Sequence, residues 1–182
     1  QLVAQIQRVD ELNRQLSEMA TTDALTGLNN RRMFDHSLQL ELAIVERRET
    51  PLSLLVLDVD HFKRINDTHG HEVGDTVLVA IAQVLGGCAR VIDIVARVGG
   101  EEFAVILPNT DTEGALEVAE RMRTAVGQAS WLAQPATISI GVATLQPAED
   151  ASSLYARADA ALYAAKAAGR NRVELAPAER GA

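Results

Sequence analysis

The most constraining feature of this sequence is a run of apolar residues from Leu52 to Val59, which contains only two polar side chains and follows Pro51. Its length suits a β-strand, and the lack of regular alternation between polar and apolar positions is typical of a strand that is covered on both faces. Such a strand needs apolar surfaces above and below it. The run therefore predicts a central strand over residues 52–60 of a packed sheet.

Segments with helical and strand periodicity alternate through the rest of the chain. Helices are predicted over 31–48, 74–86, 111–127 and 152–168, further strands over 93–98, 102–107, 136–144 and 172–175, and a polar connection over 61–73. Candidate N-caps are Asn29 or Asn30 for the first helix and Asp111 or Thr112 for the third. The two strands around Gly99-Gly100 predict a hairpin. A hairpin among strand–helix units predicts an α/β (α+β) fold, in which helices flank a mixed, largely antiparallel central sheet.

Residues 1–20 place apolar side chains in alternating steps of four and three, with Asn13 at one of these positions. A heptad seam with one polar residue favours a parallel pair of helices in a single register. An amphipathic helix that packs on its own domain explains the same pattern. We expect an N-terminal signalling or coiled-coil helix over 1–20, a globular domain over 21–175 and a tail over 176–182.

The formal net charge of −8 excludes whole classes of partner. Nucleic acids and anionic membrane surfaces are not attracted to an acidic protein, so we expect neither partner for this chain. The single cysteine, Cys88, fits a reducing compartment, and we expect a cytoplasmic domain. The first residue is Gln1, so we expect a longer parent protein with an upstream sensor or regulatory domain and, in some arrangements, a membrane anchor.

Carboxylates gather at two places that a sheet can bring together. Asp58 and Asp60 end the central strand, and Glu101 and Glu102 occupy the hairpin turn. Hard divalent cations such as Mg²⁺ prefer carboxylate oxygens and keep several waters. A strand end that faces the hairpin turn would form such a site from Asp58 and Glu101. Taken separately, each pair is also explained as an ordinary strand end and a solvated turn.

Residues suited to a nucleotide lie on either side of these carboxylates. Backbone amides at a strand-to-helix turn commonly bind phosphate, and Lys63 adds a positive charge there. The amide of Asn66 and the carboxylate of Asp75 can together pair with the edge of guanine. Lys166 and Arg170, at the end of the last helix, suit phosphate contacts. Turn chemistry, or cations that complement a helix C-terminus, explain each of them singly.

Five segments together resemble one known family. They are Asp23–Arg32, Asp58–Asp67, Gly70–Asp75, Arg97–Phe103 and Ala165–Asn171. In this order and at this spacing they resemble the GGDEF domain family, in its GGEEF variant, over residues 21–175. The resemblance implies a palm-like fold similar to nucleotidyl cyclases. It also implies a diguanylate cyclase, which condenses two GTP molecules into cyclic di-GMP, releases two pyrophosphates and works as a homodimer of facing half-sites.

The resemblance also implies roles for individual residues. Asp58, Glu101 and Glu102 are the implied catalytic residues, and Glu101 would assist deprotonation of the attacking 3′-hydroxyl. Asp58, Glu101 and the carbonyl of Val59 are the implied ligands of Mg²⁺, which Mn²⁺ can replace. The implied substrate-binding residues are Phe62, Lys63, Asn66, His71, Asp75, Arg97, Gly99, Gly100, Lys166 and Arg170.

A short motif upstream of the hairpin bears on regulation. Arg90 and Asp93 have the Arg-x-x-Asp pattern and offset of the family's inhibitory site, where cyclic di-GMP binds as an inhibitor. Arg121 is the expected secondary contact, and Arg123 on the same predicted helix is the alternative. A coincidental surface pair is the alternative explanation.

Three rival functions are consistent with parts of the sequence. The main alternative is a catalytically inactive GGDEF domain that serves as a receptor for cyclic di-GMP or GTP. The intact acids, together with Lys63, favour an enzyme. A purely structural dimerisation module leaves the nucleotide-type residues unexplained. A cyclase acting on ATP is disfavoured because Asn66 and Asp75 suit guanine.

Overall fold

The computed structural model describes residues 5–8, 21–129 and 135–178. Its centre is a five-stranded sheet, in which every neighbouring pair is antiparallel except the last. The strands lie in the order β2 (Ile94–Arg97), β3 (Glu102–Pro108), β1 (Leu52–Val59), β4 (Ile138–Thr144) and β5 (Val173–Leu175). The predicted mixed, largely antiparallel sheet is confirmed, and the fully buried strand β1 occupies its middle.

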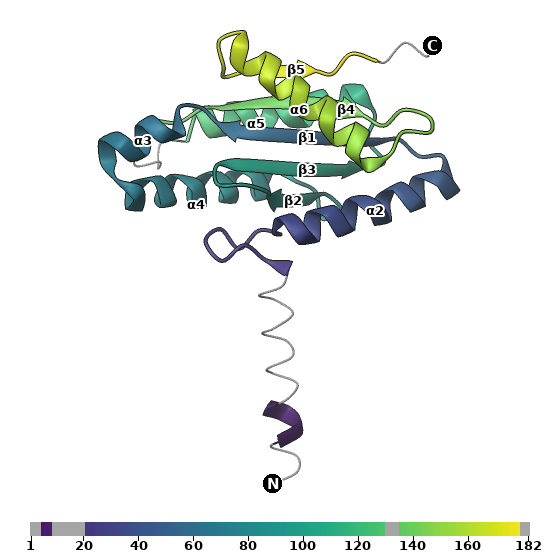
Figure 1. The fold of residues 1–182 in the computed structure, drawn as a ribbon, viewed down its shortest axis with the longest axis horizontal. Coiled ribbons are helices and arrows are strands. Elements are labelled where there is room, and N and C mark those ends of the chain that lie inside the picture. The colour runs from purple at the N-terminus through teal and green to yellow at the C-terminus, as the bar shows by residue number, and fades with distance from the viewer. Residues whose placement is uncertain (1–4, 9–20, 130–134, 179–182) are drawn as a thin grey trace.

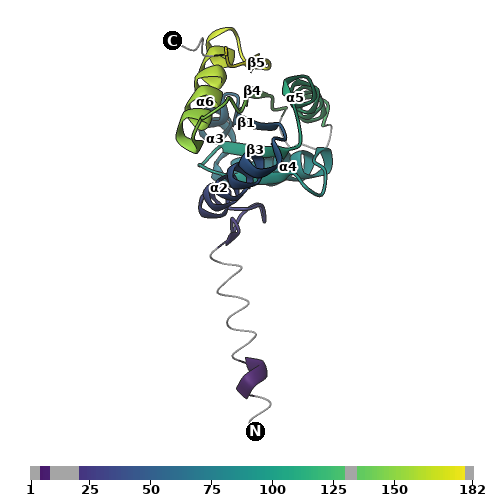
Figure 2. The ribbon, with the colours of Figure 1, turned by 90° about the vertical axis from the view of Figure 1, so that its right-hand side faces the viewer.

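Helices cover both faces of this sheet. They are α2 (Arg31–Arg48), α3 (Phe62–His69), α4 (His71–Cys88), α5 (Thr112–Gly127) and α6 (Ala151–Ala167). Successive side chains of a strand point to opposite faces. Leu55 and Leu57 therefore pack in the core that includes α4 and α5, whereas Leu54 and Val56 pack in the core that includes α2 and α6. Figure 2 shows the two helix pairs on opposite sides of the sheet.

The expectation of a polar connection over 61–73 was wrong. The segment contains α3 and the first turn of α4, which Gly70 separates with a φ of 89°. Helix α3 has only eight residues and buries only Phe62 and Ile65. Two buried positions are too few to produce a helical period in the sequence. Figure 1 shows α3 at the end of the molecule where β1 finishes, beside the start of β3.

Side-chain caps fix where the helices begin. The carboxamide oxygen of Asn30 accepts a hydrogen bond from the backbone N–H of Met33, so Asn30 caps α2. Asp111 caps α5 in the same way through Gly114. The structure thus selects one residue from each pair of candidates.

Helix α6 ends in an unusual turn. Gly169 has a φ of 118°, and Arg170 and Asn171 continue with φ of 65° and 47°. Only glycine adopts positive φ without strain. Two consecutive non-glycine residues in this conformation therefore require contacts that hold them.

The predicted stalk over 1–20 lies outside the described residues except for 5–8, which are helical. The tail is described only to residue 178. Within the described residues, no helix combines the length and apolarity needed to cross a bilayer.

Candidate active site

The end of β1 and the hairpin turn bring the acidic residues together. Asp58 pairs across the sheet with Glu102, and the backbone N–H of Val59 donates to the carbonyl of Glu101 at 3.2 Å. The antiparallel register of β1 and β3 therefore fixes the distance between the strand end and the turn. The sequence pattern suggested this juxtaposition, and the structure has it.

One cation that lies beside these carboxylates comes from a distant part of the sequence. The Nζ atom of Lys166, in the last turn of α6, lies 3.0 Å from Oδ2 of Asp58. Burial raises the pKa of Asp58 to about 6, Lys166 opposes the rise, and the charges of Glu101 and Glu102 add to it. Burial also raises the pKa of Glu101, again opposed by Lys166 and increased by Glu102. The site therefore has more negative charge than its own lysine neutralises.

This charge balance suits a divalent metal. Mg²⁺ typically takes one or two protein carboxylates and completes its shell with water, backbone oxygens and substrate phosphates. Asp58 and Glu101 supply two carboxylates, and Val59 lies between them in the hydrogen-bonded pairing of β1 with the turn. Among the described residues, no group of three or more His, Cys, Asp or Glu side chains forms a closed metal site. The donor set thus fits a metal held jointly by the protein and its substrate.

A second polar feature lies on the helices that follow β1. The Oδ1 atom of Asn66, in α3, is buried and has no hydrogen-bond partner. Gly74, in α4, packs directly against it, because a Cβ at Gly74 would overlap Oδ1 of Asn66 and lie 3.1 Å from Cζ of Phe62. A buried polar atom without a partner is rare. Because Oδ1 is enclosed by α4 at Gly74, the close approach of the two helices fixes the orientation of the Asn66 side chain.

The remaining residues expected to bind substrate lie on exposed parts of these elements. His71 and Asp75 lie on the exposed side of the first turns of α4, Lys63 is exposed at the start of α3, and Arg170 is exposed after α6. The side chain of Phe62 is buried in the core, so only its backbone is available to a phosphate.

Comparisons with known proteins agree with this geometry. The model of the family described as "Diguanylate cyclase, GGDEF domain" matches residues 20–172. The chain belongs to the GGDEF domain family.

Several relatives of this GGDEF domain are known. The chain is 45% identical over 172 residues to diguanylate cyclase A of Treponema denticola and 45% identical over 177 residues to diguanylate cyclase DgcM of Escherichia coli strain K12. These alignments cover 90% and 94% of the chain but only 46% and 42% of the two relatives. The chain thus spans less than half the length of these relatives.

Solved structures share the fold. The crystal structure of the coiled coil and GGDEF domain of DgcB from Caulobacter crescentus, in complex with c-di-GMP, is similar with a TM-score of 0.89 and 40% identity, over 96% of this chain and 95% of that one. Diguanylate cyclase SiaD from Pseudomonas aeruginosa, in complex with its activator SiaC, gives a TM-score of 0.83 at 40% identity, over 96% and 70%. Diguanylate cyclases of this family depend on a metal ion.

Arg97 of the GGDEF domain holds the signature turn in place. Its guanidinium donates to the carbonyl of Gly100 at 2.7 and 3.0 Å and forms a salt bridge with Asp23 at 3.1 Å. The Asp23 carboxylate also accepts hydrogen bonds from the backbone N–H and the hydroxyl of Thr26. These contacts engage a side chain that the resemblance assigned to substrate, and they hold the signature turn in the structure without ligand. Asp23 had no assigned role, although it opens one of the matching segments.

The two signature glycines have different surroundings. A Cβ at Gly99 would lie 2.5 Å from a carboxylate oxygen of Glu102, whereas a Cβ at Gly100 would meet no atom within 4 Å. Gly99 therefore leaves room for Glu102 within the turn. The space beside Gly100 is open to a ligand.

The residues expected to bind inhibitor surround the turn between α4 and β2. The side chain of Asp93 is fully buried, accepts from the backbone N–H of Arg90 at 2.7 Å and pairs with its guanidinium at 2.9 Å. Arg90 also donates to the carbonyl of Pro108 and the hydroxyl of Thr110. Asp93 is thus a turn-forming residue whose carboxylate is already engaged, while the guanidinium of Arg90 remains half-exposed.

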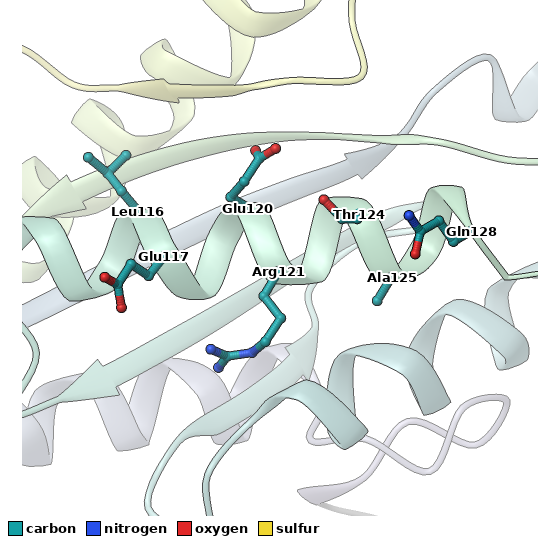
Figure 3. Close-up of a pocket in the computed structure, with 7 residues that line it drawn as sticks. All are labelled: Leu116, Glu117, Glu120, Arg121, Thr124, Ala125 and Gln128. Carbon is teal, nitrogen blue, oxygen red and sulfur yellow. The ribbon is translucent and has the colours of Figure 1, made fainter.

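Arg121 extends toward this same turn. It donates to the carbonyl of Cys88 at 2.9 Å and lines a shallow groove of about 680 Å³ on the outer side of α5. Figure 3 shows Arg121 reaching away from the helix on the opposite side from Glu120. The groove is lined by Leu116, Glu117, Glu120, Arg121, Thr124, Ala125 and Gln128. The alternative candidate, Arg123, instead pairs with Glu120 and Asn171.

Proposed function

We propose that this chain is the catalytic domain of a diguanylate cyclase, which joins two GTP molecules into cyclic di-GMP and releases two pyrophosphates. The observation that carries the proposal is the cluster of Asp58, Glu101 and Lys166, whose two acids are partly buried and opposed by one cation. Phosphoryl transfer chiefly requires positioning and neutralisation of charge. A cluster that combines metal-binding acids with a nearby cation suits this chemistry.

In each half-reaction the 3′-hydroxyl of one GTP attacks the α-phosphorus of the other, and the bond to the leaving pyrophosphate breaks. Asn66 and Asp75 would bind the guanine, and Lys166 and Arg170 would bind the triphosphate. Asp58, Glu101 and the Val59 carbonyl would hold Mg²⁺, which supplies positive charge to the phosphates and to the attacking oxygen. Glu101 would accept the proton of the 3′-hydroxyl.

The symmetry of the product points to a homodimer. Each domain provides one set of the residues above, and cyclic di-GMP contains two identical nucleotides. Two domains that face each other across a two-fold axis would place each 3′-hydroxyl against the partner's α-phosphate. An N-terminal helical pair and an upstream sensor in the parent protein would control this arrangement. The domain would work in the cytoplasm, where GTP is available.

The inhibitory site belongs to the same proposal. Arg90 presents a half-exposed guanidinium, and Arg121 reaches the adjacent turn. A planar guanidinium binds phosphate oxygens and guanine edges in pairs of hydrogen bonds. Cyclic di-GMP would therefore bind at Arg90 and reduce turnover.

The test is incubation of the purified chain with GTP and Mg²⁺, followed by chromatographic detection of cyclic di-GMP. We expect product from the native chain and none from Glu101→Ala, with circular dichroism confirming that the variant folds. Binding of cyclic di-GMP without any synthesis would overturn the proposal in favour of the inactive receptor. Competition between GTP and ATP tests the base preference.

A further inference from the structure

Asp60, the second acid of the Asp58-Val59-Asp60 sequence, makes its hydrogen bonds outside the proposed metal site. Asp60 is 5% exposed and lies one residue beyond β1. Its carboxylate accepts hydrogen bonds from the hydroxyls of Thr137 at 2.7 Å and Ser139 at 2.6 Å. It also accepts from the backbone N–H of Asn171 at 3.0 Å. These three donors satisfy a buried charge without a metal.

The contact with Asn171 joins Asp60 to the turn that follows α6. Arg170 and Asn171 both have positive φ, which costs on the order of 1 kcal/mol at Arg170 and less at Asn171, since asparagine adopts this region more readily than other non-glycine residues. The backbone N–H of Asn171 is held by Asp60, and its side-chain oxygen accepts from Arg123 at 2.8 Å. Asn171 is therefore fixed from both its backbone and its side chain. The residue immediately before it is Arg170.

We infer that Asp60 is a positioning residue that holds the turn carrying Arg170 in its left-handed conformation, so that Arg170 can bind the substrate's phosphates, and that Asp60 is not a metal ligand. The inference rests on the proposed function for the role of Arg170. The contacts of Asp60 do not depend on that function.

Replacement of Asp60 by asparagine separates positioning from metal binding. The carboxamide oxygen of this variant can still accept from Thr137 and Asn171, and its amide can donate to the hydroxyl of Ser139, since a hydroxyl both donates and accepts. A neutral carboxamide is, however, a poor substitute for a carboxylate that binds Mg²⁺. The two roles therefore predict opposite results for Asp60→Asn.

The experiment compares Asp60→Asn and Asp60→Ala with Asp58→Asn as the matched loss of a metal-binding acid. For Asp60→Asn we expect kcat, the KM for GTP and the Mg²⁺ requirement all within about threefold of native, because the hydrogen bonds survive. For Asp60→Ala we expect the KM for GTP to rise about tenfold with a smaller change in kcat, since hydrogen bonds to a charged group are lost. Asp58→Asn should abolish turnover.

Amide hydrogen exchange supplies a readout that needs no activity. The Asn171 amide should exchange about tenfold faster in Asp60→Ala and at the native rate in Asp60→Asn. Asp60→Ser provides a second variant if Asp60→Ala does not fold, because its hydroxyl is polar but too short to hold the Asn171 amide. It should raise the KM for GTP and speed exchange of the Asn171 amide in the same direction as Asp60→Ala.

Two outcomes would overturn the inference. One is an Asp60→Asn variant that loses turnover as Asp58→Asn does, with an altered Mg²⁺ requirement. The other is unchanged exchange at the Asn171 amide in Asp60→Ala, or in Asp60→Ser where that variant replaces it. If the native chain made no cyclic di-GMP, the proposed function would fail, while the exchange result would still decide whether Asp60 holds the turn.

Discussion

The ammonium group of Lys166 lies 3.0 Å from a carboxylate oxygen of Asp58, although 108 positions separate the two residues in the sequence. Both side chains are assigned to the same reaction, one to the triphosphate and one to the metal. Without ligands they neutralise each other in part. Nucleotide and metal together would separate them, because each then has a stronger partner.

Replacement of Lys166 by methionine should therefore have opposite effects on the two ligands. We expect the KM for GTP to rise about tenfold, because a charged phosphate contact is lost. Binding of Mn²⁺ alone, followed by water proton relaxation, should become tighter by several-fold, since no ammonium competes for Asp58. Arg47→Met, at an exposed cation in the last turn of α2, is the matched control and should change neither value. Weaker Mn²⁺ binding in Lys166→Met would contradict the competition.

Asp58 should destabilise the metal-free protein at neutral pH. Burial raises its pKa to about 6, with Lys166 opposing the rise, so the folded state binds the extra proton more readily than the unfolded state. The resulting cost is fully present above pH 6 and disappears as the pH falls toward 4. We expect Asp58→Asn to raise the free energy of unfolding at pH 7.5 by ~1–2 kcal/mol, a value reduced for solvent screening and for the loss of the Lys166 pair. Urea unfolding in EDTA should show this gain shrinking at pH 4.5, and an equal gain at both pH values would refute the explanation.

The link between Asp23 and Arg97 should couple the start of the domain to the signature turn. A double-mutant cycle with Asp23→Asn and Arg97→Gln should give a coupling free energy of ~1 kcal/mol in unfolding experiments. Arg97→Gln should lower turnover by more than the loss of folded protein accounts for, because the Gly100 carbonyl in the signature turn loses both guanidinium contacts. Additive effects in the cycle would show that the two residues act separately.

Gly74 should control the shape of the guanine-binding region. An alanine there would displace the Asn66 side chain and crowd Phe62. We expect Gly74→Ala to raise the KM for GTP about tenfold, to reduce discrimination against ATP and to cost ~1–3 kcal/mol of stability through overpacking. Gly86→Ala in the same helix is the control, because its Cβ would meet no atom within 4 Å. It should leave GTP binding at the native level and stabilise the helix by up to ~1 kcal/mol.

Arg90→Ala should relieve product inhibition. The change removes a half-exposed side chain from the turn between α4 and β2, which makes no contact with Asp58, Glu101 or Lys166 among its hydrogen bonds. We expect the initial rate of turnover to stay near the native value. In a time course with GTP, the rate of the variant should no longer fall as cyclic di-GMP accumulates. The lost contacts to Asp93, Pro108 and Thr110 should cost ~1–3 kcal/mol of stability, because the buried Asp93 carboxylate loses its guanidinium partner. A collapse of initial turnover would assign Arg90 to the core or the active site instead.

Much of the fold was predictable because it is encoded locally. The apolar run of β1 could be stable only between two layers of side chains, and the paired strands around Gly99 could form only a hairpin. Helix α3 was missed for the opposite reason. Its two buried residues become a helical face only when α4 packs beside them.

The site divides in the same way. The sequence by itself predicted the acids of the site, the cations at the end of α6 and the candidates for guanine, because residue type and spacing determine which ligands a group can hold. Only the tertiary structure decided that Arg97 is engaged by Asp23 and Gly100, and that Asp60 faces Asn171. Hydrogen bonds between residues that are 74 and 111 positions apart depend on how the strands and helices meet. No local pattern records such distances, whereas the sheet register and the turn after α6 set them directly.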